Sequence, residues 1–400
     1  MRDWASLLSS RRRRDVMGEA GRTRIAPVVL NGTGRVGWEF ARLLSEEATE
    51  IRDRTGCLPV LRAAASIRGI LFSHEGLALD DLNVLADTGA GQTGTGAAKW
   101  SWLDGGTGAS RLSAFSLGDY PLVLDLVRGE VPGVVVEATP TGIETGEPGL
   151  SHIVTAMRKG FSAVTLAKGP LVVAFGRLVR LAEEKGVSLR YSGAVGAALP
   201  TVDTAMYSMA GSGIFEIQGV LNGTTNFILN SMGTGKAYSD ALAEAQAMGV
   251  AEANPRLDVE GFDSASKLLI IANTVWGCEL GLSTIDRQGI TGLDPAFVRE
   301  CRDGGTPVRL VARAALERAG GQGDEEEGAP GRRLPKLSVR PEPVPAGHPF
   351  ANLPGTSKAV LFKSRNMGDV VVSGGASDVK GAAASAIKDL IHILEERRKA

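Results

Sequence analysis

The chain has 400 residues, of which 43% are hydrophobic and 22% are charged, and its formal net charge is −1. This composition is typical of a globular protein of two domains, and the balanced charge gives no basis for binding nucleic acid or an anionic membrane. No apolar stretch is as long as a membrane span, and the first residues lack the apolar core of a signal peptide, so we expect a cytoplasmic protein. The scattered cysteines and histidines argue against a disulfide framework and a histidine metal site. Residues 1–24 are polar and basic and are expected to form a flexible tail.

A glycine-rich turn follows the first predicted strand, 26–31, and precedes a predicted helix, 35–46. The pattern G-x-G-x-x-G in this context is typical of dinucleotide sites. Its first glycine permits a tight turn, its second lets the backbone approach a pyrophosphate, and its third lets helix and strand pack closely. The N–H groups at the start of the helix attract phosphates. We therefore predict that a dinucleotide binds at this turn, which consists of Gly32, Thr33, Gly34, Arg35, Val36 and Gly37.

The next predicted strand, 59–66, bears on the choice of dinucleotide. An acidic residue at its end would bind the ribose 2′-hydroxyl and select NAD, whereas an arginine suits the 2′-phosphate of NADP. Here the strand ends at Ser66 and is followed by Arg68, with no acidic residue. A serine hydroxyl and a guanidinium favour NADP. The alternative is that Arg68 is a solvated loop charge, which leaves NAD open.

Strands and helices alternate through the next part of the chain. After a Gly/Thr-rich loop at 88–98, the expected elements are a helix at 121–128, a strand at 133–137, a helix at 149–159 and a strand at 162–165. The first of these strands is almost continuously apolar, as a central strand of a parallel sheet is. The alternation predicts an α/β fold over residues 25–170, with a Rossmann-type doubly wound parallel sheet that binds NAD(P).

The remaining residues predict a second, α+β domain. The expected helices are 171–185, 236–248, 262–277 and 380–397, and the expected strands are 213–221, 336–340, 358–363 and 369–373. A low-complexity stretch at 319–333 is predicted to be a flexible loop. We place the second domain at 171–353 and expect residues 354–400 to return to the nucleotide-binding domain.

Two groups of polar residues follow neighbouring strands of the predicted parallel sheet. Thr139 and Pro140 come after the strand at 133–137, and Lys168 comes after the strand at 162–165. The carboxyl ends of parallel strands meet at one edge of a sheet, where ligands bind. These residues are therefore predicted to lie at the same crevice as the glycine-rich turn.

An acidic segment leads into the predicted helix 262–277. Asp263 and Lys267 are four residues apart, so they share one face of the helix, and a surface ion pair is the simplest interpretation. An apolar run follows Lys267 directly, however, so this lysine is expected to be partly desolvated, as a general acid or base often is. The carboxylates of Glu252, Asp258 and Asp263 suit a substrate ammonium group. The alternative is a solvated acidic loop.

Four long motifs resemble those of homoserine dehydrogenases, and the resemblance extends over about residues 26–395. The motifs are Glu137–Pro148, Ala167–Pro170, Gly219–Asn226 and Glu252–Lys267. The resemblance implies NAD(P)-dependent interconversion of L-homoserine and L-aspartate 4-semialdehyde, in the biosynthesis of threonine and methionine. Two alternatives stay open. One is another NAD(P) dehydrogenase of an amino-acid pathway, and the other is a non-catalytic NADP-binding regulatory protein.

The resemblance also implies roles for individual residues. It makes Lys168 and Lys267 the two lysines of the active site, and we favour Lys267 as the acid/base and Lys168 as the orienting charge. Glu252 and Asp263 would hold the amino group of the substrate. Other residues would line the site, with Asn222, Gly223, Thr224 and Thr225 on the substrate side and Thr139 and Pro140 beside the nicotinamide.

Three further expectations rest on the resemblance. In this family a loop binds a monovalent cation, Na⁺ or K⁺, through backbone oxygens, which here would be those of Val195, Ala197 and Leu199. Many relatives have a glutamate where Ser192 stands. The chain ends soon after its last predicted helix, so neither a C-terminal ACT domain nor ACT-mediated feedback by threonine is expected. A homodimer is expected, because the middle domain of the family forms a dimer.

Overall fold

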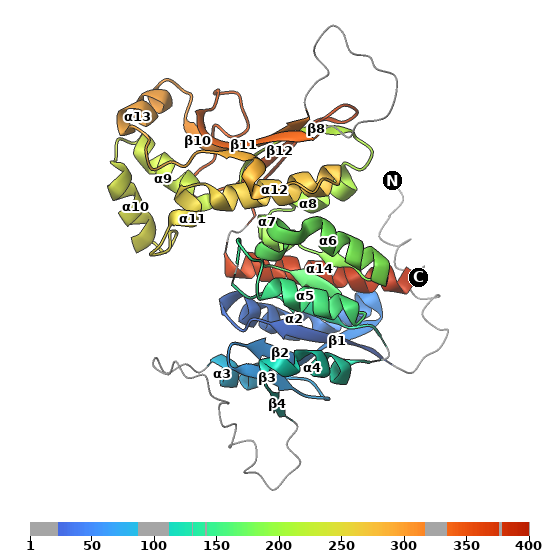
Figure 1. The fold of residues 1–400 in the computed structure, drawn as a ribbon. Coiled ribbons are helices and arrows are strands. Elements are labelled where there is room, and N and C mark those ends of the chain that lie inside the picture. Colours follow the sequence, from blue (N-terminus) through green and yellow to red (C-terminus); the bar gives the residue numbers. More distant parts are fainter. Residues whose placement is uncertain are drawn as a thin grey trace, which may run out of the picture.

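The computed structural model describes most of the chain (Figure 1). The described residues are 23–86, 112–129, 131–140, 142–316, 334–375 and 378–399. Almost all of the predicted tail at 1–24, and both predicted loops, at 88–98 and 319–333, lie outside the described residues.

The first of two sheets has seven strands in the order β4-β3-β2-β1-β5-β6-β7. The strands from β2 to β7 in this order run parallel, and β3 and β4 are antiparallel additions that the sequence did not predict. The predicted Rossmann-type fold class is confirmed, except that two antiparallel strands extend one edge of the parallel sheet. The strands are β1 (Arg24–Asn31), β2 (Cys57–Ser66), β3 (Gly69–Phe72), β4 (Ser113–Phe115), β5 (Val134–Glu137), β6 (Ser162–Thr165) and β7 (Leu189–Arg190).

Helices cover both faces of this sheet. Val28 and Leu30 of β1 join an apolar cluster with α2, α3 and α14, whereas Val29 joins a cluster with α4 and α5. Successive side chains of a strand point to opposite faces of its sheet, so β1 is buried on both faces. The helices are α2 (Arg35–Thr55), α3 (Leu79–Ala86), α4 (Tyr120–Val127), α5 (Gly149–Arg158) and α14 (Val379–Lys399). None of the described helices is both long enough and apolar enough to cross a membrane.

The second sheet has six strands in the order β13-β12-β8-β10-β11-β9. Helix α12 packs against β8, β10 and β11, and its residues 268–273 are all buried (Figure 1). The strands are β8 (Ile214–Val220), β9 (Ile285–Arg287), β10 (Val308–Leu316), β11 (Pro335–Pro343), β12 (Ala359–Ser364) and β13 (Gly368–Ser373). The helices are α6 (Gly169–Lys185), α7 (Ser192–Gly196), α8 (Thr201–Asp203), α9 (Gly223–Gly233), α10 (Tyr238–Ala247), α11 (Arg256–Val259), α12 (Phe262–Trp276) and α13 (Pro295–Asp303).

The chain passes between the two sheets more than once. The sequence predicts that residues 354–400 return to the first domain as one segment, but β12 and β13 pair within the second sheet, and only α14 packs on α2. Strand β7 joins the first sheet, although it follows residue 170. One apolar cluster continues from Ile153 of α5 through Leu171 of α6 to Leu268 of α12. The two domains therefore share a core.

The glycine-rich turn has the geometry that its pattern predicts. Gly32 has a φ of 91°, and a Cβ there would lie 2.6 Å from the carbonyl carbon of Ala138. A Cβ on Gly37 would lie 1.8 Å from the carbonyl oxygen of Gly32, whereas a Cβ on Gly34 would have no atom within 4 Å. Gly32 and Gly37 are therefore required by close contacts between backbone segments, and Gly34 leaves an open surface in front of α2.

We expect Gly37→Ala to destabilise the protein. Alanine normally favours a helix over glycine, but here its methyl group would force α2 away from β1, with an expected loss of roughly 1–3 kcal/mol or more. Thermal unfolding of Gly37→Ala and Gly34→Ala would measure this effect. The Gly34→Ala variant should unfold at the temperature of the unmodified protein, and equal stability of both variants would contradict the close approach.

Candidate active site

A cleft of about 1360 Å³ lies between the two domains and collects most of the residues that the sequence singled out. Its nucleotide end is formed by the glycine-rich turn and the end of β2, and its other end by α9, α11 and α12. Four of the predicted residues do not line it, namely Gly37, Arg68, Leu199 and Thr225. The predicted residues that do are Gly32, Thr33, Gly34, Arg35, Val36, Ser66, Thr139, Pro140, Lys168, Val195, Ala197, Asn222, Gly223, Thr224, Glu252, Asp258, Asp263 and Lys267.

The carboxylate of Asp263 lies between two lysines from different domains. The Nζ of Lys267, one turn along α12, donates to Oδ2 of Asp263 at 2.6 Å, and the Nζ of Lys168 lies 3.5 Å from Oδ1. All three side chains are largely buried, since none is more than 22% exposed. The ion pair that the helical spacing suggested is therefore a buried one, and it faces the cleft.

The charge state of Asp263 follows from these neighbours. Burial opposes its ionisation, but the ammonium groups of Lys267 and Lys168 outweigh burial and hold the pKa of this carboxyl well below its usual range. Asp263 is therefore ionised throughout the neutral range. Its oxygens are occupied by the two lysines and by the side-chain amide of Asn222.

Asn222 connects α9 to the acidic segment. Its Oδ1 caps α9 by accepting a hydrogen bond from the N–H of Thr225 at 2.8 Å. Its Nδ2 donates to Oδ1 of Asp258 at 2.7 Å and to Oδ2 of Asp263 at 2.9 Å. A single amide thus fixes two carboxylates in front of the cleft.

Asp258 differs from Asp263 in its electrostatic surroundings. Burial, and then the negative charge of Asp263, raise the pKa of Asp258. No lysine or arginine among the described residues forms an ion pair with Asp258. Glu252 lines the same end of the cleft and is exposed. These two carboxylates could therefore receive a positively charged group of a ligand.

A buried glutamate supports the nucleotide end of the cleft. Glu137, at the end of β5, is fully buried and accepts hydrogen bonds from the N–H and hydroxyl of Thr139. It also contacts the Nδ2 of Asn31 at 3.2 Å and the Nδ1 of His152 at 2.8 Å. These contacts fix the turn at Thr139 and Pro140 opposite the start of α2. Gly34 leaves open space before the start of α2, where the N–H groups of a helix can bind a phosphate. This end of the cleft therefore fits a dinucleotide.

The known proteins that resemble this chain include homoserine dehydrogenases. A family model described as homoserine dehydrogenase matches residues 200–391. The homoserine dehydrogenase of Methanocaldococcus jannaschii is 32% identical, over 69% of this chain and 77% of that protein. The NAD(+)-dependent homoserine dehydrogenase of Pseudomonas canavaninivorans is 33% identical, over 65% of this chain and 70% of that protein. The chain belongs to the homoserine dehydrogenase family.

A solved structure is similar over the whole fold. A putative homoserine dehydrogenase from Archaeoglobus fulgidus superposes with a TM-score of 0.72 and 30% identity, over 92% of this chain and 99% of that one. The protein is therefore an NAD(P)-dependent homoserine dehydrogenase, as the motifs predicted. The sequence left open two alternatives, another NAD(P) dehydrogenase of an amino-acid pathway and a non-catalytic NADP-binding regulatory protein. The family assignment replaces both.

A third lysine, which the sequence did not single out, lines the cleft of this homoserine dehydrogenase. Lys358 lies just before β12, is only 4% exposed, and donates from Nζ to the carbonyl oxygen of Gly196 at 2.7 Å. Burial, and then the positive charge of Lys267, lower its pKa to about 8. A motif search misses Lys358 because it lies about 90 residues from the nearest acidic motif in the chain.

The loop that was expected to hold a monovalent cation fits one poorly. The ammonium of Lys358 already lies on the carbonyl of Gly196, in the middle of this loop. The carbonyl of Leu199 accepts the N–H of Thr201 at 2.8 Å and does not line the cleft. A second positive charge would be repelled by the first, and in a buried site such repulsion is strong. No step of the mechanism is therefore assigned to a metal ion.

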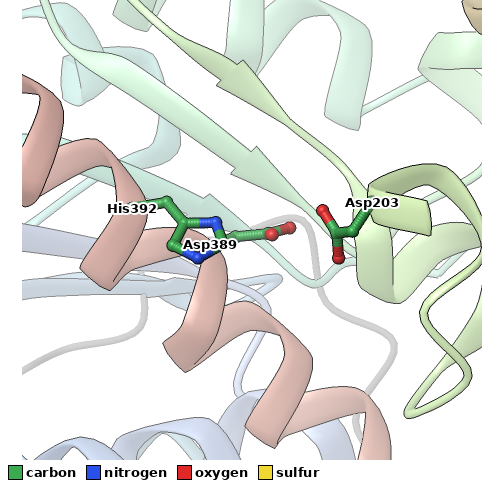
Figure 2. A group of neighbouring side chains, drawn as sticks. All are labelled: Asp203, Asp389 and His392. Atoms are coloured by element: carbon green, nitrogen blue, oxygen red, sulfur yellow. The ribbon is translucent and has the colours of Figure 1, made fainter. Parts of the chain in front are cut away.

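Ser192, where many relatives have a glutamate, is paired with a carboxylate from elsewhere. Its N–H and hydroxyl donate to the two oxygens of Asp389 on α14, at 2.9 and 2.8 Å. Asp389 also belongs to a group with Asp203 and His392 that has the spacing of metal ligands (Figure 2). The ammonium of Lys388 contacts both of these carboxylates. One ammonium thus offsets part of the charge of the two carboxylates, and the contact of Asp389 with Ser192 anchors α7 to α14.

The raised pKa of Asp258 predicts the stability of a variant. Ionised Asp258 destabilises the native state, so Asp258→Asn should raise the free energy of unfolding at neutral pH by about 0.5–1 kcal/mol. The gain should vanish as the pH falls through the pKa of Asp258, where the unmodified protein is protonated. Thermal unfolding against pH measures it.

Asp125 provides a control of opposite sign. Its exposed carboxylate pairs with Lys159, and this contact lowers its pKa. Asp125→Asn should therefore leave stability unchanged or lower it slightly at neutral pH. An Asp258→Asn variant that is less stable than the unmodified protein at neutral pH would contradict the predicted electrostatics.

Proposed function

We propose that Lys267 is the proton-transfer group of the homoserine dehydrogenase reaction. An ammonium has three N–H donors. Lys267 uses one toward Asp263 and one toward the carbonyl of Leu221, at 2.9 Å, which leaves one for the hydroxyl oxygen of the substrate. In the oxidation direction, the neutral amine of Lys267, or a water that it holds, takes the hydroxyl proton. In reduction, the ammonium returns that proton to the developing alkoxide.

Lys168 and Asp263 position this proton transfer. One carboxylate oxygen of Asp263 holds Lys267 in a single orientation. The other oxygen faces the ammonium of Lys168. Lys168 then presents a fixed positive charge to the oxygen that becomes negative in the reaction, and stabilisation of this kind lowers the barrier. Asp263 is therefore proposed to act on the lysines, and the ammonium of the substrate is assigned to Asp258 and Glu252, whose charges are not neutralised by lysines.

The cofactor is proposed to bind along the nucleotide end of the cleft. When bound, NAD(P) supplies the nicotinamide that accepts the hydride from C4 of homoserine. The N–H groups at the start of α2, with Thr33, Arg35 and Val36, would hold the pyrophosphate. Thr139 and Pro140, fixed by Glu137, would border the nicotinamide.

NADP is the preferred cofactor in this proposal. The end of β2 presents the half-buried hydroxyl of Ser66 to the cleft, and no carboxylate lies beside it on β2. Arg68 is exposed and does not line the cleft, but its neighbour Ile67 does. Its guanidinium is therefore free to reach a 2′-phosphate that binds there.

A homodimer is also proposed, from the family resemblance. Strand β13 forms one edge of the second sheet and exposes Val371, which is 41% accessible. An exposed edge of this kind is suited to pairing with a second chain.

Substitution of the two lysines tests the catalytic proposal. Lys267→Met keeps the aliphatic stem and should lower kcat for homoserine-dependent NADP⁺ reduction by about 10²- to 10⁴-fold. Lys168→Met should lower it by about 10²- to 10³-fold, because it removes one charge that stabilises the oxyanion. Lys185→Met, on the exposed end of α6, is the control and should leave kcat unchanged. Near-full kcat in Lys267→Met would refute its assigned role.

Substitution of Arg68 tests the choice of cofactor. Arg68→Ala should lower kcat/KM for NADP⁺ by about 10- to 100-fold and leave that for NAD⁺ almost unchanged, since only NADP⁺ carries the phosphate. Arg52→Ala, in which a half-buried arginine of α2 outside the cleft is removed, is the control. Equal losses with both cofactors would show that Arg68 does not read the phosphate.

A further inference from the structure

Lys358 is a buried cation without a counterion. Its Nζ makes one hydrogen bond, to the carbonyl of Gly196, so two of its three N–H donors have no partner among the described residues. No carboxylate of the described chain lies within ion-pair distance of it. Burial of a charge is unfavourable unless it is paired. The charge of Lys358 and two of its N–H donors therefore lack a partner until a negatively charged group of a ligand enters the cleft.

The surroundings of Lys358 place that group at the substrate end. Lys267, Asp263 and Lys168 are the charged groups whose fields act on Lys358, and all three belong to the reacting end of the cleft. Thr356, two residues before it, contacts the helix start at Gly223. The glycine-rich turn that receives the pyrophosphate lies at the opposite end. The phosphates of the cofactor are therefore not the partner of Lys358.

The substrate has one charged group that no residue yet receives. Homoserine carries a hydroxyl, an ammonium and a carboxylate. The proposed function assigns the hydroxyl to Lys267 and the ammonium to Asp258 and Glu252. Three lysines line this end of the cleft. Lys168 and Lys267 both pair with Asp263, so Lys358 is the one that has no carboxylate partner among the described residues. A carboxylate is the group that would complete the charge balance.

We propose that Lys358 binds the α-carboxylate of the substrate. This inference rests on the proposed function, since it takes the placement of the hydroxyl at Lys267 as given. Held at three points, by Lys267, by Asp258 with Glu252, and by Lys358, the substrate presents C4 in one orientation. Lys358 thereby makes the site selective for an α-amino acid over an amino alcohol or an amino acid amide.

Two substrates and one substitution test this role. Lys358→Met keeps the stem and removes the charge, and L-homoserine amide keeps the shape of the substrate but is neutral where the carboxylate was. Lys358→Met should lower kcat/KM for L-homoserine by about 10- to 100-fold, the usual effect of losing one charged hydrogen bond. It should leave kcat/KM for the amide, already low in the unmodified enzyme, almost unchanged.

Three further variants sharpen the comparison. Lys358→Arg keeps the positive charge and should retain most of the preference for the carboxylate. Lys363→Met removes a lysine of β12, the strand that follows Lys358. Lys363 pairs with Glu216 outside the cleft, so this variant should affect neither substrate. Lys358→Gln, which can still donate to Gly196, should behave like Lys358→Met and replaces it if that variant does not fold.

The outcomes separate this inference from its rivals. Equal losses for homoserine and its amide in Lys358→Met and Lys358→Gln would overturn the inference and indicate a structural role. A weaker Kd for NADP⁺ with unchanged substrate preference would overturn it in favour of a cofactor contact. Absence of turnover in the unmodified enzyme, or full activity of Lys267→Met, would instead contradict the proposed function.

Discussion

The shared ion pair of Asp263 is the interaction on which the site depends. Lys267 comes from α12 of the second domain, and Lys168 follows β6 of the first, so one buried carboxylate joins both domains at the cleft. Removing one partner from a buried pair leaves an uncompensated charge, which typically costs about 3–5 kcal/mol. The same contact therefore orients Lys267, for which we propose the proton transfer, and joins the two domains at the cleft.

Buried polar side chains fix the groups around this pair. Asn222 caps α9 and holds Asp258 and Asp263 together, while Glu137 holds the turn at Thr139 and Pro140. Asp389 accepts two hydrogen bonds from Ser192, and it supplies from α14 the carboxylate that a glutamate at position 192 would supply. Each is buried and satisfied by hydrogen bonds, so each gives the backbone around it a single conformation.

Local patterns predicted two features of the cleft better than they predicted some of the helices. The strand–turn–helix context of Gly32 to Gly37 and the spacing of Asp263 and Lys267 were confirmed. Helix α9 was not predicted, because glycine, threonine and asparagine in its first turn are weak helix formers. It forms because Asn222 caps it and its apolar side chains pack on α10, α13 and β10. Tertiary packing thus overrides propensity at the substrate end of the cleft.

By itself, the sequence determined the nucleotide turn, the alternation of the first domain and the identity of the family, because these depend on residues close together in the chain. Only the tertiary structure decided which distant charges meet. It brings Lys358 to Gly196, Asp389 to Ser192 and Lys168 to Asp263, across separations that no local spacing encodes. It also pairs Asp263 with two lysines and Asp258 with none, so burial and neighbouring charge shift the pKa values of two similar carboxylates in opposite directions.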